Sequence, residues 1–176
     1  MTLSVRNPVR SAAPQLRVAT PADAAAVAAV RNAAAADLTS RYGTGGWSNN
    51  TSERGVLFDM RRGTVYVATY NAGAVATLML SIRKPWAVNK SYFSPSAKPL
   101  YLTAMAVVPE RQRQGIGTEC LVQAAEFARS WPADTIRLDA WDHASGAGAF
   151  YAKCGYREVG RAQYRGAALV YFELPL

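Results

Sequence analysis

The spacing of apolar and polar positions predicts seven β-strands. Residues 15–19 (QLRVA) alternate apolar and polar side chains, which is the period of a strand with one buried face. Residues 100–108 (LYLTAMAVV) are almost continuously apolar and end at Pro109, a pattern typical of a central strand buried on both faces. The expected strands cover residues 15–19, 64–70, 74–82, 100–108, 135–141, 157–163 and 167–174.

Four segments carry the signals of helices instead. The first opens with Thr20, Pro21 and Asp23, which supply a capping hydroxyl, a proline at the first helical position and an acid in the first turn. An alanine-rich run then continues to about Ser40, and its composition reflects helix propensity rather than disorder. The expected helices cover residues 20–40, 52–63, 117–129 and 148–154.

The order of these elements, β-α-α-β-β-β-α-β-α-β-β, predicts a mixed α/β (α+β) fold. We expect one domain over residues 15–176, with a central, mostly antiparallel mixed sheet of about seven strands flanked by about four helices. A length of 176 residues fits one domain. Residues 1–14 are polar and contain two prolines, so we expect a flexible leader there.

The composition narrows the environment of the protein. No run approaches about 18 uninterrupted apolar residues, so we expect no membrane span. The N-terminus has no apolar segment typical of a secretory signal, so we expect Cys120 and Cys154 to be reduced thiols in a cytoplasm. A lone histidine, His143, and these two distant cysteines cannot supply a four-ligand zinc site, so we expect no metal.

The net charge of +8 indicates an anionic partner, such as nucleic acid, a membrane surface or a phosphate-bearing small molecule. The basic residues are scattered, and Arg61 and Arg62 are the only adjacent arginines. Scattering argues against a nucleic-acid arm, and no recognition motif accompanies the charge. Composition alone does not choose among the three kinds of partner, and a nucleic-acid-binding domain is the lowest-ranked function for this chain.

The segment 107–118 (VVPERQRQGIGT) places two glycines at the start of a helix directly after the buried strand. The first turn of a helix offers unpaired N–H groups and the positive end of the helix dipole, which together bind anions. Gly115 and Gly117 leave room for a diphosphate near the backbone, and Arg111 and Arg113 add positive charge. The spacing fits neither a Rossmann nor a phosphate-loop fingerprint, and alone it also fits an ordinary helix-start loop.

Residues 112–117 (QRQGIG) resemble the Gln/Arg-x-x-Gly-x-Gly/Ala signature of the GNAT superfamily of acetyl-CoA-dependent N-acetyltransferases. The preceding run 106–110 (AVVPE) and the later run 149–156 (AFYAKCGY) are similar to two neighbouring motifs of that family. The resemblance extends over about residues 15–176 and is strongest over 100–156. It implies acetyl-CoA as the acyl donor and explains part of the positive charge.

The resemblance also implies roles for individual residues. Backbone N–H groups would hold the coenzyme A diphosphate at Arg113, Gln114, Gly115, Gly117 and Thr118. The pantetheine arm would pair with the backbone of Met105, Ala106 and Val107 like an added strand, and Ser145 would contact its amide. The Val107 N–H would polarise the thioester, and Tyr151 would be the general acid that protonates the departing thiolate. The alternative for Tyr151 is a half-buried ring that only packs the last helix.

Two departures from the family pattern leave questions open. Ala144 stands where many relatives have an asparagine, and the central strand carries no carboxylate, so the general base is not evident. The candidates for the base are Asp139, Asp142, His143, Glu53 and Asp59. An exposed loop position is the alternative for His143.

The acceptor site is expected between the first two helices and the long loop 83–99. Four aromatic residues would form its wall: Tyr42, Trp47, Trp86 and Tyr92. The alternative is that these rings, with Phe93, cover the sheet. The predicted activity is acetyl transfer from acetyl-CoA to a primary amine of a small molecule or peptide, by direct attack in a ternary complex in the cytoplasm. A homodimer is common in the family, and a non-catalytic acyl-CoA-binding regulatory module is the alternative function.

Overall fold

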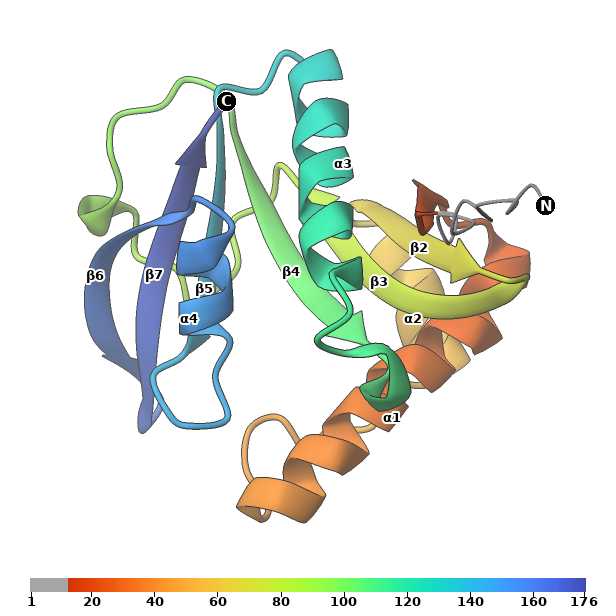
Figure 1. Cartoon of the computed structure of the whole chain (residues 1–176). Helices are drawn as coiled ribbons and strands as arrows, with labels where there is room; N and C mark the ends of the chain where they lie inside the picture. Colours follow the sequence, from red (N-terminus) through yellow and green to blue (C-terminus); the bar gives the residue numbers. More distant parts are fainter. Residues whose placement is uncertain (1–12) are drawn as a thin grey trace, which may run out of the picture.

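The computed structural model describes residues 13–176, and the predicted leader 1–14 lies almost wholly outside them. The predicted mixed α/β fold is confirmed (Figure 1). The strands are β1 (Gln15–Val18), β2 (Thr64–Tyr70), β3 (Gly73–Ser81), β4 (Pro99–Val107), β5 (Thr135–Trp141), β6 (Arg157–Tyr164) and β7 (Ala167–Pro175). The α-helices are α1 (Ala24–Tyr42), α2 (Glu53–Met60), α3 (Ile116–Ser130) and α4 (Gly148–Lys153), and short 3-10 turns lie at Pro21–Asp23, Lys90–Tyr92 and Pro109–Arg111.

The seven strands form one sheet in the order β1-β2-β3-β4-β5-β7-β6. Every neighbouring pair is antiparallel except β4 and β5, which are parallel. These two central strands pair only from Pro99 opposite Thr135 to Tyr101 opposite Arg137. Beyond Tyr101 they diverge, as Figure 1 shows, so the rest of β4 has no partner strand on its β5 side within residues 13–176.

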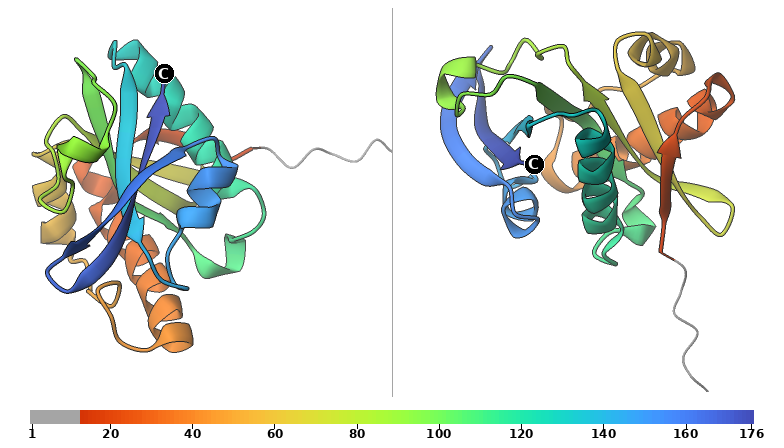
Figure 2. Two further views of the ribbon diagram at one scale, coloured as in Figure 1. Left: turned by 90° about the vertical axis from the view of Figure 1, so that its left-hand side faces the viewer. Right: turned by 90° about the horizontal axis from the view of Figure 1, so that it is seen from above.

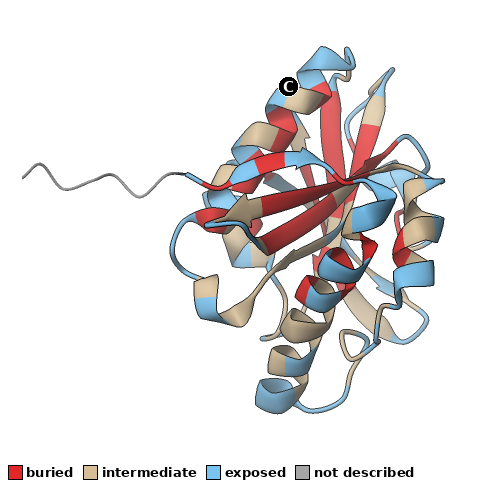
Figure 3. Cartoon of the chain, turned by 90° about the vertical axis from the view of Figure 1, so that its right-hand side faces the viewer, coloured by how far each residue is buried: buried red, intermediate tan, exposed pale blue. Residues whose placement is uncertain are grey.

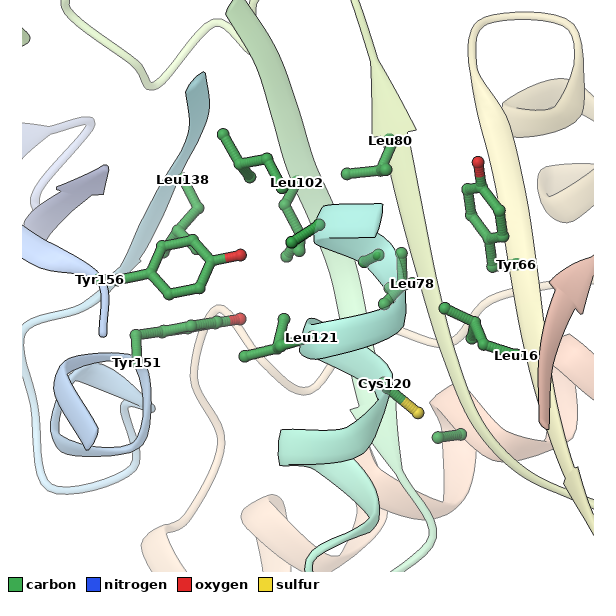
Figure 4. Close-up of a cluster of buried hydrophobic side chains, with 14 of the residues drawn as sticks. Leu16, Tyr66, Leu78, Leu80, Leu102, Cys120, Leu121, Leu138, Tyr151 and Tyr156 are labelled. Carbon is green, nitrogen blue, oxygen red and sulfur yellow. The ribbon is translucent and has the colours of Figure 1, made fainter. Parts of the chain in front are cut away.

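The helices form two layers, with α1 and α2 on one face of the sheet and α3 and α4 on the other (Figure 2). The largest apolar cluster lies beneath α3 and α4 and includes Leu121 of α3, Leu102 of β4 and Leu138 of β5 (Figure 4). A second cluster joins α1 and α2 to β2 through Val27, Val56 and other small apolar side chains.

The long loop between β3 and β4 covers the α1 face of the sheet beside β5 and β7. Phe93 and Val88 are buried there against Tyr101 and Tyr171. The Tyr171 hydroxyl donates a 2.6 Å hydrogen bond to the Ala87 carbonyl, which ties the loop to the sheet. On the α1 face, strands β5 and β7 are therefore covered by this loop rather than by a helix.

The prediction that residues 100–108 are buried on both faces is correct only for the first part of the strand. Leu100, Tyr101 and Leu102 are buried, whereas residues 103–107 are only partly buried or exposed. Ala104 has a φ of 51°, at the point where the register between β3 and β4 shifts. The mostly apolar side chains of residues 103–106 line an open cleft instead, because β5 diverges from this part of β4.

Burial also decreases along α1. Its first turns pack on the sheet through Val27 and Val30, which are fully or almost fully buried. Its second half, after residue 30, is at most partly buried and extends past the sheet (Figure 3). This half forms a wall of the cleft.

Candidate functional site

A cleft of about 400 Å³ lies where β4 and β5 diverge. It is lined on one side by α1 and the loop after it, and on the other by Tyr151 of α4. Because those helices cover opposite faces of the sheet, the cleft passes through the sheet between the parted strands. Its lining residues are Arg31, Ala34, Ala35, Leu38, Trp47, Asn49, Thr51, Leu102, Thr103, Ala104, Met105, Ala106, Asp139, Ala140, Trp141, Ser145, Gly146, Ala147 and Tyr151.

The loop that leads into α3 presents a row of backbone amides. Within residues 13–176, the amides of residues 113–118 have no hydrogen-bond partner. Gly115 adopts the left-handed conformation at φ 83° and turns the chain into the helix, and this conformation favours glycine. The Gln112 side chain donates a 3.0 Å hydrogen bond to the Val107 carbonyl and fixes the loop against the end of β4. The row is an anion cradle at a helix N-terminus.

Gly117 is needed for close packing of the helices rather than for an unusual backbone conformation. A Cβ atom there would lie 3.0 Å from the Phe150 ring and 3.6 Å from the Met105 side chain. The first turn of α3 can therefore approach both α4 and the cleft-lining Met105 only because this residue has no side chain. Thr118 adds a 3.6 Å contact between its Oγ1 and the Cys154 sulfur. The anion cradle thus lies next to the cleft.

The end of β4 exposes backbone groups on the side that faces away from β3. The Val108 N–H donates a 2.9 Å hydrogen bond to the Val75 carbonyl of β3. Because successive residues of a strand present their backbone groups to opposite edges, Val107 directs its N–H away from β3, toward the gap left by β5. Met105 and Ala106, earlier on the same strand, line the cleft.

Tyr151 is buried in α4, with 5 % of its surface exposed. Its ring packs against Phe150, Tyr156 and Phe172, with centroid distances of 5.3 to 6.0 Å. Figure 4 shows its hydroxyl pointing away from α4, toward Leu121 of α3. Burial raises the pKa of this phenol, and the nearby Asp139 raises it further. The hydroxyl is thus held in its protonated form, in which it can donate a proton.

An aromatic cluster closes the α1 end of the cleft. The Trp47 ring stacks on the His143 ring at 5.3 Å, and Tyr42 meets the same imidazole edge-on at 6.1 Å. His143 Nδ1 is 2.9 Å from the Ser145 hydroxyl and accepts a 3.1 Å hydrogen bond from the Ser145 N–H. His143 is an exposed residue of the loop after β5, and its ring contacts Tyr42 and Trp47. Trp47 and Ser145 line the cleft, whereas Tyr42 does not.

The structure does not bring the other predicted wall residues to this cleft. Tyr92 packs on Tyr171 at 5.3 Å, and Trp86 is 86 % exposed on the long loop. No residue of 83–99 lines the cleft among the residues that the structure describes. Trp86 and Tyr92 are therefore not part of this cleft, because contacts with β7 hold the loop over another part of the sheet.

Of the five candidates for the base, one lies in the cleft as a carboxylate. Asp139 of β5 lines it, and burial raises the pKa of its side chain. Asp142 accepts 2.9 Å hydrogen bonds from Arg161, and Asp59 pairs with Arg31 at 2.6 Å, so both carboxylates are engaged. Glu53 lies in the first turn of α2 and does not line the cleft.

Arg31 is a cleft residue that the sequence reasoning missed. It is the one basic residue among the alanines and valines of residues 24–36, four positions after the buried Val27. Residues four apart lie on the same face of a helix, so this spacing was a signal that Arg31 faces inward.

Comparison with known proteins decides the family. The model of the Acetyltransferase (GNAT) family matches residues 29–156, which include the anion cradle, the parted strands and Tyr151. The chain belongs to the GNAT family. Among curated protein sequences, no relative matches this GNAT chain.

Solved structures share the GNAT fold at low sequence identity. A GCN5-related N-acetyltransferase from Rhodopseudomonas palustris is 20% identical with a TM-score of 0.71, and the match covers 97% of this chain and 100% of that one. The ribosomal-protein-S18-alanine N-acetyltransferase from Escherichia coli is 16% identical with a TM-score of 0.69, and the match covers 92% of this chain and 93% of that one. The protein yncA from Salmonella typhimurium, whose structure holds its cofactor acetyl-CoA, is 16% identical with a TM-score of 0.68. This match covers 94% of this chain and 95% of that one.

Two further properties concern residues 13–176 only. No helix in this range is both long and apolar enough to cross a membrane. The same residues contain no group of three or more His, Cys, Asp or Glu side chains arranged to hold a metal ion.

Proposed function

We propose that the protein is an N-acetyltransferase that transfers the acetyl group of acetyl-CoA to a primary amine. One observation carries this proposal: the anion cradle at residues 113–118 lies next to a cleft that is lined by the buried Tyr151 and by the open edge of β4. A donor can therefore enter from the α3 and α4 side while an acceptor enters from the α1 side. Membership in the GNAT family supports the same reaction.

The residues present fit coenzyme A. The unpartnered amides of Arg113, Gln114, Gly115, Gly117 and Thr118 suit a diphosphate, and they need no side chain to reach it. The open edge of β4 at Met105, Ala106 and Val107 suits the amides of pantetheine, because an extended chain can complete a strand edge. Ser145 lines the same cleft and can contact the arm near its thiol end. When bound, acetyl-CoA supplies the acetyl thioester.

Three groups of the chain would carry the proton transfers and stabilise the developing charge. Asp139 accepts a proton from the acceptor ammonium, and its burial raises its pKa and makes it a stronger base. The Val107 N–H faces the gap and donates to the carbonyl oxygen on which negative charge develops. Tyr151 then gives its phenolic proton to the thiolate that leaves. The ammonium gives up two protons overall: one replaces the proton that Tyr151 has donated to the thiol, and the other passes through Asp139 to solvent, so each turnover releases one proton.

The acceptor would enter between α1 and the aromatic cluster of Tyr42 and Trp47. This arrangement supports direct attack in a ternary complex, because the cleft has walls on both faces of the sheet, from which the two substrates would approach. A small-molecule or peptide amine fits such an opening. A cytoplasmic location and a homodimer stay predictions from the sequence.

Calorimetric titration with acetyl-CoA, followed by detection of free thiol with a broad panel of amines, tests the proposal. We expect acetyl-CoA to bind and at least one amine class to release coenzyme A. Binding without thiol release from any amine would favour the regulatory acyl-CoA-binding module instead. Absence of acetyl-CoA binding at millimolar concentration would refute both functions.

A further inference from the structure

The Arg31 side chain is an unusual charge in the wall of the cleft. Only 9 % of it is exposed, although it belongs to a helix whose neighbouring cleft residues are Ala34, Ala35 and Leu38. A buried arginine is ordinarily retained only where its guanidinium group is paired and its donors are satisfied. The hydrogen-bond partners of its three guanidinium nitrogens therefore indicate the role of Arg31.

Its pairing is incomplete in a specific way. Nη1 donates to the Asp59 carboxylate at 2.6 Å. Nε and Nη2 are buried and have no hydrogen-bond partner among the residues that the structure describes. These two nitrogens lie along one edge of the planar guanidinium group, and their parallel N–H bonds match the two oxygens of a carboxylate. The neighbouring Thr103 Oγ1 of the cleft wall is likewise buried without a partner within residues 13–176.

Asp59 explains the charge of Arg31 but not its free edge. An unsatisfied buried donor destabilises the folded state, and a charged donor does so more strongly, so the chain retains these unpaired nitrogens at the expense of stability. Arg137 provides a contrast, because its guanidinium lies over the Phe93 ring at 5.0 Å and donates to the Ser94 carbonyl, and it does not line the cleft. Arg31 is thus a buried arginine of the cleft wall that has two unpaired nitrogens among the residues that the structure describes.

We propose that the free edge of Arg31 binds a carboxylate group of the acceptor, so that the substrates are small amines that carry a carboxylate, as amino acids do. This inference rests on the proposed acetyl transfer. Asp59 already balances one charge beside Arg31, which favours a monoanion over a doubly charged phosphate or phosphonate. The cleft of about 400 Å³ must also admit the acetyl end of the donor, which favours a small acceptor.

The opposite wall of the cleft completes the recognition. Asp139 of β5 lines the same cleft as Arg31 of α1. An acceptor with one ammonium and one carboxylate group can then bind its carboxylate to Arg31 of α1 and place its amine beside Asp139 of β5. Tyr151 lines the same cleft. A neutral amine would leave the Arg31 edge unsatisfied, which lowers its affinity relative to the matched carboxylate.

The test compares three matched forms of each acceptor: the amino acid, its carboxamide and its decarboxylated amine. Thiol release gives kcat/KM for each form, and amino phosphonates serve as dianionic comparators. We expect the carboxylate form to be preferred by about tenfold or more, mainly through KM. Equal use of the three forms, or a preference for the carboxamide, the amine or the phosphonate, would overturn the inference while leaving acetyl transfer established.

Variants of the chain assign the preference to Arg31. Arg31→Met should lower kcat/KM for the amino acid much more than for its decarboxylated amine and so remove the preference, whereas Arg31→Lys should keep only part of it, because lysine lacks the two-pronged edge. Arg41→Met on the same helix, where Arg41 pairs with Asp37 at 2.6 Å on the surface, is the matched control. If Arg31→Met does not fold, Asp59→Asn keeps Arg31 and should retain or strengthen the preference; loss of the preference there would contradict the assignment.

A binding measurement covers the case in which the panel contains no efficient acceptor. N-acetylated amino acids and their carboxamides are titrated by calorimetry onto the wild-type protein in the presence of coenzyme A. Tighter binding of the acids is expected, and binding of neither or of both alike would overturn the inference. Failure of acetyl-CoA itself to bind would instead refute the proposed function.

Discussion

Replacing Tyr151 with phenylalanine is the most direct test of the proposed chemistry. The change removes one oxygen atom and keeps the ring, which packs against Phe150, Tyr156 and Phe172. Because the apolar contacts stay, we expect the free energy of unfolding to change by less than about 1 kcal/mol. Any large loss of turnover would then reflect the missing proton donor rather than a damaged fold.

The expected loss follows from the state of the hydroxyl. Burial and the nearby Asp139 raise the pKa of Tyr151 above the ordinary value of 10.0, so the phenol is fully protonated at neutral pH. Proton donation by a positioned side chain contributes about 10²–10⁴-fold in rate, which corresponds to about 2.7–5.4 kcal/mol. We therefore expect kcat to fall by about 100-fold or more, with little change in acetyl-CoA affinity.

Steady-state thiol release and calorimetry with acetyl-CoA separate these two effects. Tyr156→Phe is the matched control, because the Tyr156 hydroxyl is also buried and points the same way as that of Tyr151, yet it does not line the cleft (Figure 4). Turnover of Tyr151→Phe within twofold of wild type, or an equal loss in Tyr156→Phe, would refute the assignment. So would a wild-type rate that declines with Tyr151 ionisation below pH 10, since the raised pKa places that loss at higher pH.

Three further predictions concern the base, the cofactor cradle and stability. Asp139→Asn should lower kcat/KM and remove the acidic limb of the pH–rate profile, because activity in the wild type falls as pH drops through the raised pKa of this carboxyl group; an unchanged limb would exclude Asp139 as the base. Gly117→Ala places a Cβ 3.0 Å from the Phe150 ring and should weaken acetyl-CoA binding in calorimetry, and unaltered binding would show that the helices adjust freely. The hydrogen bonds from Arg17 hold the pKa of Asp23 well below its ordinary value of 3.8, so Asp23→Asn should lower the free energy of unfolding at neutral pH. Denaturant unfolding should show that the difference between wild type and variant shrinks as the pH falls below 3.8. A difference in stability that persists in acid would contradict this linkage.

The sequence determined the elements and their order, because their signals are local. The start of α1 is set by the bonds from the Thr20 backbone and hydroxyl to Asp23, and α2 begins where the Ser52 hydroxyl accepts from the Gly55 N–H. Such bonds join residues three apart, so they are written in a short stretch of sequence. The anion cradle at 113–118 was predictable for the same reason, since a loop and the first turn of one helix contain all its amides.

The parts of the site that depend on long-range packing required the tertiary structure. An apolar run alone could not show that β4 and β5 pair for only three residues and then part, because pairing depends on segments more than thirty residues away in the chain. For the same reason the aromatic residues of the long loop looked like an acceptor wall, although Tyr92 is drawn onto Tyr171 of a strand near the C-terminus.

Arg31 and Asp139 show the division most clearly. Each is readable in the sequence as a charge within a mostly apolar stretch, and periodicity indicates which face it occupies. Only the fold decides that the two charges line one cleft, that Asp59 satisfies one nitrogen of Arg31, and that the other edge is left open. Local hydrogen bonds and side-chain period thus fix which elements form, whereas the chemistry of the site arises where distant elements meet, because burial and pairing are properties of the packed chain.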